Sequence, residues 1–582
     1  MIKQEGQPVN TDGFLATFLE RLKDLPDNSR VLLQTVLYGA VAGAVSVFFM
    51  MCINFLFTNT FIAFATRSLG FFLTASFMVV MGSSLLVGIL ISRYAPDEAG
   101  SGIPQLKAAY WKEVGYVPWL PVLVKFIAGV LSIGGGASLG REGPTIYIGG
   151  GIASNVSGYF GTPARQRRSA IIVGASAGIA AAFNAPLAAI AFILEEIVGD
   201  INSRFVGRIV LSSVVGAFVV FAIIGEQPAF RLPIVDYISP LHYLIVPIVA
   251  IIASLVGVVF QHSTLFMRAQ VKRHYTMPQW LKPCCGGLIV WIIGAACFYT
   301  TGKVGVFGLG YEDLSNALAN NFIWWAAGVL MIAKVAATVI SLAFGGCGGV
   351  FSPLLFIGGM CGYFLGGIAD LWIPLTPSDR ILLSAVGMST CLGVVVREPL
   401  TSLLIVFEMT HQFSLVPALM VGTIISVIIS HAAAKANFYD SVLIQDGHEL
   451  IKIRPPLDIM SWQNLPVSSI ANPNTVTVKD LKVETLRQTI ESHPYNCFPI
   501  LLGDNGIGLI TRDQILSILD QGKIPNIQTA ITCYPDQAVR DVGNAFIESP
   551  HGCIIVVERK TNKIAGIITL HDLLRAQASI MG

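Results

Sequence analysis

One glutamate stands in a Gly-rich, apolar stretch of the chain, where a charged side chain needs an explanation. Residues 134–150 read GGGASLGREGPTIYIGG, and Arg141 and Glu142 are the charged residues among them. An ionisable side chain in an apolar region is a functional candidate by default. An ionised carboxylate is itself an anion and can block an anion site, whereas a protonated one loses its charge and can swing away. Glu142 is therefore a candidate for a carboxylate that lies in an anion pathway and moves. The alternative is a static Arg141–Glu142 pair, although burying an ion pair is seldom favourable.

Three short motifs combine glycine with proline: GSGIP (100–104), GREGP (140–144) and GGVFSP (348–353). Proline suits the first turn of a helix, because the N–H that it lacks would have no helical partner there. Each motif therefore predicts a helix that begins inside the apolar region. Helix starts present free N–H groups and roughly half a positive charge. Several starts that point to one place would bind an anion and still release it. One such motif alone would indicate a kink or a packing contact, but three together favour the anion site.

Two further segments carry a proline and a glutamate nine residues apart. APLAAIAFILE (185–195) corresponds to EPLTSLLIVFE (398–408). Glu195 thus corresponds to Glu408, whereas the adjacent Glu196 has an apolar counterpart. We expect Glu195 and Glu408 to share a structural role, and Glu196 to serve a function that one half alone needs. The alternative for Glu196 is an ordinary solvated carboxylate at a helix end.

The elements that must position these residues are membrane helices. Of the 582 residues, 54% are hydrophobic and 12% are charged, about half the charged share of average soluble proteins. A bilayer crossing takes roughly 20 apolar residues. Stretches of about this length or longer lack Asp, Glu, Lys and Arg at 169–194, 209–225, 243–267, 335–369 and 412–434. We therefore expect an integral multi-pass membrane protein.

Other function classes find little support in the composition. The net charge of +2 comes without a long basic patch, so no nucleic-acid partner is expected. The ten cysteines form no CxxC or Cys/His metal spacing, and no metal site is expected. The nine histidines form no nucleophile–base pair, which argues against an enzyme. The sequence also lacks the GxxxxGK[ST] motif, so a P-loop ATPase pump is not expected. The polar start lacks the apolar core of a signal peptide.

The membrane part contains an internal repeat. Pro144 and Pro353 are 209 residues apart, and Pro186 and Pro399 are 213 apart. Duplicated, Gly- and Pro-interrupted membrane segments are typical of transporters that bind their substrate between broken helices. We expect an all-α polytopic membrane domain built from two inverted repeats with broken helices, followed by a C-terminal α/β domain.

Four regions follow along the chain. Residues 1–30 are expected to form a cytosolic N-terminal segment, and residues 31–450 the transmembrane transport domain. The Pro pair of IRPPLDIM marks a linker at 451–464. Residues 465–582 alternate short strands with helical patterns, as an α/β domain does.

In combination and in this order, the three motifs resemble those of the CLC family of chloride channels and chloride/proton antiporters, over nearly the whole chain. The resemblance implies that the anion is held by the Ser101 hydroxyl, the backbone N–H groups of Val350 and Phe351, and the Tyr439 hydroxyl in NFYDS. Without the resemblance, Tyr439 would be interpreted as an interfacial anchor. A serine at 101 fits chloride as the transported ion, with other halides and nitrate also passing.

The same resemblance implies roles for the two candidate acids and for the assembly. Glu142 would be the gating glutamate, and Glu196 the internal proton acceptor, where channel members carry an apolar residue. The implied assembly is a homodimer in which each subunit has its own pathway.

The C-terminal region resembles a pair of CBS domains, because GLITRDQIL (508–516) and GIITLHDLL (566–574) repeat at 58 residues. CBS domains bind adenine nucleotides in many proteins, and Thr569 and Asp572 match the positions that contact a nucleotide ribose. The first copy departs from this pattern, since Gln514 stands where the second has Asp572. A purely structural or dimer-stabilising tail is the alternative to an ATP or AMP sensor; no cofactor is required for transport.

We therefore expect chloride/proton antiport across a membrane, gated by a protonatable glutamate that competes with chloride. A passive chloride channel, gated by voltage or pH, is the alternative. A nucleotide-binding regulator with a membrane anchor is a third class, against which the intramembrane Glu142 argues. The CBS domains are expected in the cytosol, and the protein in a plasma or inner membrane.

Overall fold

The computed structural model describes residues 26–163, 167–201, 205–225, 242–274, 277–448, 465–502, 506–522, 527–549, 551–559, 561 and 563–573. The chain divides into two compact units, Met1–Ile453 and Arg454–Gly582, and each is described by itself. The expected linker at 451–464 and most of the expected N-terminal segment at 1–30 lie outside the described residues.

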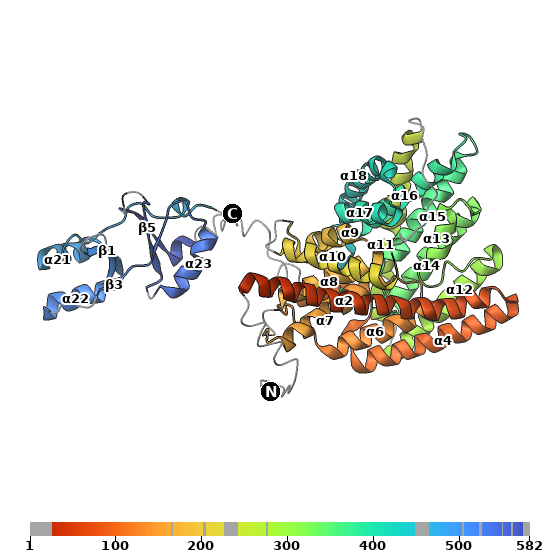
Figure 1. The fold of residues 1–582 in the computed structure, drawn as a ribbon, viewed down its shortest axis with the longest axis horizontal. Coiled ribbons are helices and arrows are strands. Elements are labelled where there is room, and N and C mark those ends of the chain that lie inside the picture. The colour runs from red at the N-terminus through yellow and green to blue at the C-terminus, as the bar shows by residue number, and fades with distance from the viewer. Residues whose placement is uncertain are drawn as a thin grey trace. The chain divides into compact units, whose positions relative to one another are not determined.

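The first unit is a helical membrane domain (Figure 1). Its longer helices are α2 (Asp27–Phe57), α4 (Leu69–Tyr94), α6 (Trp119–Gly134), α7 (Glu142–Tyr159), α8 (Arg168–Phe183), α10 (Val206–Ile223), α11 (Val246–His274), α12 (Lys282–Thr301), α14 (Trp324–Ala343), α15 (Phe351–Ala369), α16 (Pro377–Val396) and α18 (Val416–Ala433). Its shorter helices are α3 (Ala63–Ala65), α5 (Ile103–Trp111), α9 (Pro186–Phe192), α13 (Tyr311–Leu318), α17 (Pro399–Thr410) and α19 (Phe438–Gln445). Within the described ranges, nine helical segments are long and apolar enough to cross a membrane.

Two halves of this domain repeat one another, as the sequence predicts. Helix α7 packs against α8, and α15 packs against α16. At the first crossing Gly149 meets the carbonyl of Gly174, and at the second Gly358 meets the carbonyl of Gly387; a Cβ at either position would collide with backbone. The second pair follows the first by 209 and 213 residues, the same offsets as the proline landmarks. Small residues at such crossings let membrane helices approach closely.

The three Gly/Pro motifs begin helices, as predicted. Helix α5 begins at Ile103 with Pro104 as its second residue, and α7 begins at Glu142 with Pro144 as its third. Helix α15 begins at Phe351 inside the third motif. Each motif therefore supplies the N-terminal backbone groups of one short or broken helix.

The second unit is a small α/β domain. Its strands are β1 (Cys497–Leu502), β2 (Gly506–Thr511), β3 (Gln528–Thr529), β4 (Thr532–Cys533), β5 (Cys553–Val557) and β6 (Ile564–Thr569), and its helices are α21 (Val483–Ser492), α22 (Arg512–Gln521) and α23 (Val539–Glu548). The sheets have the orders β1-β2-β3 and β4-β5-β6. In the first sheet the strands are antiparallel, and in the second β4 is parallel and β6 antiparallel to β5. The predicted strands and their repeat are confirmed, and an apolar cluster shared by β2, β5 and their neighbours joins the two copies.

Candidate functional site

The three motif loops are tied directly to one another through backbone hydrogen bonds. Gly140 and Gly349 exchange N–H···O bonds of 2.7 and 2.6 Å. Gly100 donates to the Gly346 carbonyl at 3.1 Å and accepts from the Gly348 N–H at 3.2 Å. The loops before α5, α7 and α15 therefore meet, although they are separated by up to about 250 residues of sequence.

Glu142 is fully buried at the first position of α7, and its carboxylate points to the start of α15. One carboxylate oxygen accepts hydrogen bonds from the Tyr311 hydroxyl at 3.2 Å and from the Ser352 hydroxyl. The other accepts from the Ser352 backbone N–H at 3.3 Å. Ser352 is the second residue of α15, so the carboxylate lies at a helix start that favours negative charge.

Arg141 does not hold Glu142 in place. Its guanidinium donates to the Ala182 carbonyl at 2.9 Å and lies 5.5 Å from the centre of the Tyr311 ring. In the part of the chain that the structure describes, no Arg141–Glu142 ion pair is formed. The static pair that sequence reasoning kept as the alternative is therefore wrong.

The expected chloride ligands lie around the same helix starts. Val350 and Phe351 begin α15, and the Phe351 ring stacks on Tyr439 with centroids 6.5 Å apart and planes 18° apart. The Ser101 side chain lies against Gly143 of α7. Ser101 and Tyr439 are buried and face one another, and neither hydroxyl has a regular hydrogen-bond partner among the described residues. Buried hydroxyls are normally hydrogen-bonded, so both retain the capacity to donate to an anion.

Glu196 is buried and paired, and the alternative of a solvated carboxylate is wrong. It lies on the π-helical segment η4 (Ile193–Val198) that continues α9, and it is 1% exposed. One carboxylate oxygen accepts from Lys107 Nζ at 2.7 Å, and the other from Asn437 Nδ2 at 2.8 Å. Lys107 also donates to Asp440 at 2.6 Å. Tyr439 lies within electrostatic range of both Glu196 and Glu142, although no contact joins the two acids directly.

Glu195 and Glu408 cap one another's helices across the repeat. The Glu195 carboxylate accepts from the Leu400 and Thr401 N–H groups at 3.1 and 2.9 Å, at the start of α17. The Glu408 carboxylate accepts from the Leu187 and Ala188 N–H groups at 3.0 and 2.7 Å, at the start of α9. The predicted shared structural role is therefore confirmed, and it consists of exchanged N-terminal caps.

Sequence reasoning missed three residues around the acids. Ser352 stands inside the GGVFSP motif, and its hydroxyl next to Pro353 could have marked it as a candidate. Lys107 is a lone cation on the short helix that GSGIP begins. Tyr311 offers no such signal, because its place beside Glu142 arises from packing between distant segments.

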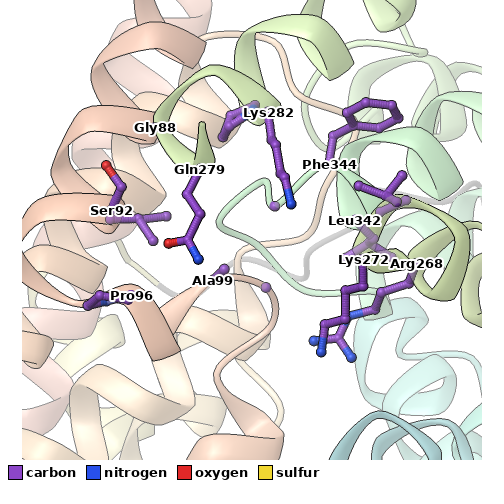
Figure 2. Close-up of a pocket in the computed structure, with 16 residues that line it drawn as sticks. Gly88, Ser92, Pro96, Ala99, Arg268, Lys272, Gln279, Lys282, Leu342 and Phe344 are labelled. Carbon is purple, nitrogen blue, oxygen red and sulfur yellow. The ribbon is translucent and has the colours of Figure 1, made fainter. Parts of the chain in front are cut away.

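A basic cavity of about 200 Å³ lies apart from these acids (Figure 2). Its lining includes Arg268, Lys272 and Lys282, and the first two also pair with Asp446. A neighbouring cavity of about 700 Å³ shares Arg268 and Lys272 and extends along α5 and α19. This second cavity has walls of mixed charge, because Asp97, Glu98, Glu113 and Asp446 line it together with Lys112, Arg268 and Lys272.

In the second unit, Thr569 and Asp572 are bonded to each other. The Asp572 carboxylate accepts from the Thr569 N–H at 2.9 Å and from its hydroxyl at 2.7 Å. In the first copy Thr511 and Gln514 make the equivalent cap, with N–H···O distances of 2.9 and 3.3 Å. The motif therefore has a local structural role in both copies, and its contact with a nucleotide stays a prediction.

Comparisons with known proteins agree with this architecture. A family model described as "Voltage gated chloride channel" matches residues 83–431, and a CBS domain model matches residues 526–579. The H(+)/Cl(−) exchange transporter ClcA of Vibrio cholerae serotype O1 is 30% identical over 451 residues, which are 75% of this chain and 92% of that protein.

Two solved structures share the fold. A slow cyanobacterial Cl−/H+ antiporter has a TM-score of 0.64 at 24% identity, over 72% of this chain and 97% of its own. A eukaryotic CLC transporter has a TM-score of 0.60 at 17% identity, over 96% of this chain and 99% of its own. With the family model spanning both repeats and the motif loops meeting around a buried glutamate, this chain belongs to the voltage gated chloride channel (CLC) family and carries a C-terminal CBS domain.

Proposed function

We propose that this protein exchanges chloride for protons across a membrane, and that the Glu142 carboxylate competes with chloride for its binding site. The observation that carries the proposal is the hydrogen bond from the Ser352 N–H to the buried Glu142 carboxylate. It places a titratable negative charge on the helix start whose neighbouring N–H groups are the predicted chloride ligands. The relatives named as H(+)/Cl(−) exchange transporters also favour antiport over passive conduction.

In the proposed mechanism, chloride binding and protonation both displace the Glu142 side chain from the start of α15. Chloride binds through the Ser101 and Tyr439 hydroxyls and the N–H groups of Val350 and Phe351. Protonation removes the charge of Glu142, so the side chain no longer competes for the helix start and chloride can advance. Glu196 accepts the proton from the opposite side of the membrane, in a buried place where Lys107 and Asn437 stabilise its ionised form.

The test is proton movement driven by a chloride gradient in liposomes that contain the purified full chain. We expect the wild type to move protons against their gradient. Glu196→Ala should retain chloride flux and lose proton movement, whereas Glu142→Ala should lose proton movement and leak chloride. Glu491→Ala, at an exposed glutamate of α21, serves as the control and should behave as the wild type does. A reversal potential that ignores the pH gradient would replace antiport with a passive channel.

We also propose that the protein acts as a homodimer with one pathway per subunit, in a plasma or inner membrane with the CBS domains in the cytosol. The family resemblance supports this arrangement. A purified particle of twice the chain mass, and protease access to the CBS domains from the cytosolic side alone, are the expected results.

An adenine nucleotide at Thr569 and Asp572 is a separate proposal, supported by the match to a CBS model. Equilibrium binding of ATP and AMP to the full chain tests it. Asp572→Ala should weaken binding, whereas Gln514→Ala should not. No binding by the wild type would favour a structural tail, and equal binding by both variants would show that Asp572 does not contact the nucleotide.

A further inference from the structure

Each repeated half of the membrane domain carries one fully buried lysine on the helix before its broken-helix start. Lys125 lies on α6 and Lys334 on α14. They are 209 residues apart, the same offset as between Pro144 and Pro353. A charged side chain inside a membrane domain is costly and marks a functional candidate. Because both halves keep the lysine, its partners in each half indicate what the charge does.

Lys334 binds the loop that leads into α13. Its ammonium donates to three carbonyls of this loop, those of Gly305 at 2.9 Å, Val306 at 3.3 Å and Gly308 at 2.7 Å. An ammonium has three N–H donors, so the loop occupies all of them. Asp313, in the first turn of α13, accepts from the Gly305 N–H at 2.7 Å. The loop is therefore held both by the lysine and by the helix that follows it.

Lys125 makes the matching contact with the loop that leads into α5. Its ammonium donates to two carbonyls of this loop, and one of them is that of Gly100 at 3.2 Å. Gly100 stands three residues before α5 begins at Ile103. Gly308 likewise stands three residues before α13 begins at Tyr311. Both glycines have a positive φ, 90° and 56°, which favours glycine. The two lysines therefore bind equivalent points of equivalent loops.

The matched loops present different side chains to the pathway. The segment GSGI (100–103) corresponds to GLGY (308–311). The first loop presents Ser101, a predicted chloride ligand. The second has a leucine at that position and presents the Tyr311 hydroxyl, which donates to the Glu142 carboxylate at 3.2 Å. One lysine therefore fixes the loop of a chloride ligand, and the other fixes the loop of a donor to the gating glutamate.

We propose that Lys334 is a positioning residue for the gate. By fixing the loop before α13 it holds the Tyr311 hydroxyl against Glu142, and so sets the chloride concentration at which chloride displaces the carboxylate. The distance of 3.2 Å is already beyond the usual O–H···O range of about 2.5–3.0 Å, so a small shift of the loop breaks the contact. The inference rests on the proposed competition between Glu142 and chloride, and it names a residue that decides how firmly the carboxylate is held.

The first test measures chloride flux against chloride concentration, at fixed pH, for Tyr311→Phe in liposomes. Phenylalanine keeps the ring and removes the hydroxyl that donates to Glu142. A hydrogen bond to a charged group corresponds to a factor of roughly ten or more, so half-maximal flux should occur at about tenfold lower chloride concentration. An unchanged chloride dependence would overturn the proposal, because Lys334 would then have no gate contact to position.

The second test changes the lysine in two ways. Lys334→Gln removes the charge and one of the three donors, whereas Lys334→Arg keeps the charge but places a larger, planar group among the three carbonyls. We expect both variants to shift the chloride dependence in the direction of Tyr311→Phe, by about threefold or more. An arginine variant that matches the wild type would overturn the proposal, since the charge alone would then act on the anion. It decides the question even if the glutamine variant does not fold.

The other half of the chain supplies a matched control. Lys125→Arg disturbs the loop of Ser101 and leaves the loop of Tyr311 in place. In a Tyr311→Phe chain, Lys334→Arg should add no further shift, whereas Lys125→Arg should change the chloride dependence by the same factor with or without the tyrosine. A full additional shift from Lys334→Arg in that chain would overturn the proposal. These measurements use chloride flux alone, so a wild type that moves chloride without protons would refute the antiport and leave them valid.

Discussion

Replacing Ser352 by alanine tests whether the helix start that binds the Glu142 carboxylate is contested by chloride. The serine hydroxyl and the serine N–H both donate to the carboxylate, and the substitution removes the hydroxyl alone. The two remaining contacts, from the Tyr311 hydroxyl at 3.2 Å and the Ser352 N–H at 3.3 Å, are long. The variant should therefore weaken the hold of the site on Glu142 without removing the backbone donor.

The size of the effect follows from the burial of the acid. A hydrogen bond to a charged group contributes about 1.5–3 kcal/mol, and no solvent reaches Glu142 to replace the lost donor. A carboxylate that is held less tightly by this amount competes less well with chloride. Since 1.4 kcal/mol corresponds to a factor of ten, half-maximal chloride transport should occur at roughly 10- to 100-fold lower chloride concentration.

The assay is chloride flux against chloride concentration at fixed pH, for Ser352→Ala in the wild type and in a Glu142→Ala chain. A double-mutant cycle of this kind isolates the interaction between two residues. We expect the shift in the wild-type chain and none in the Glu142→Ala chain, where the carboxylate is absent. The same shift in both chains would show that Ser352 acts on chloride directly, and would refute the competition.

Three further predictions concern packing, charge and pH. Lys107→Met should lower the apparent melting temperature strongly, because removing one partner of a buried ion pair costs about 3–5 kcal/mol. Lys107→Arg should restore much of the lost melting temperature. An unchanged melting temperature in the methionine variant would contradict the ion pair between Lys107 and Glu196. Gly358→Ala should destabilise the chain by about 1–3 kcal/mol, because its Cβ would collide with a backbone carbonyl of α16. Denaturation of the purified variant measures this loss of stability. A variant as stable as the wild type would contradict the close crossing of α15 and α16. In the second unit, the Cys553 thiol donates to the Cys497 sulfur and lowers the pKa of Cys497 to about 7. Alkylation of Cys497 should therefore rise as the pH passes through 7, and Cys553→Ala should move that rise toward the ordinary thiol value of about 8.5; identical pH profiles would exclude the contact.

Much of the fold can be predicted because its signals are local. Proline after glycine fixes where α5, α7 and α15 begin, since proline is tolerated in a first helical turn and not further along. The offsets of 209 and 213 residues reveal the repeat without any structure. The shared role of Glu195 and Glu408 follows from that repeat. Each glutamate occupies the same place in its half, so each can reach the same kind of partner, the backbone N–H groups at a helix start.

The partners of the unmatched residues cannot be predicted in this way. Glu196 has an apolar counterpart in the second half, and its contacts with Lys107 and Asn437 join segments 89 and 241 residues apart. Lys107 likewise stands close to the GSGIP motif, and nothing in the sequence says that it faces Glu196 rather than the anion. Contacts between distant segments arise from tertiary packing, which residue type and spacing do not encode.

The exchanged caps have a consequence for how the two halves depend on each other. The segment that begins at Pro186 carries Glu195 about 14 Å further along its own axis, at 1.5 Å per residue, so it cannot cap its own start. A lone half would keep a bare helix start and an unmatched carboxylate, whereas two identical halves facing each other would satisfy both at once. Neither half can therefore complete its helix start by itself, and the exchanged caps make the folding of each half depend on the other.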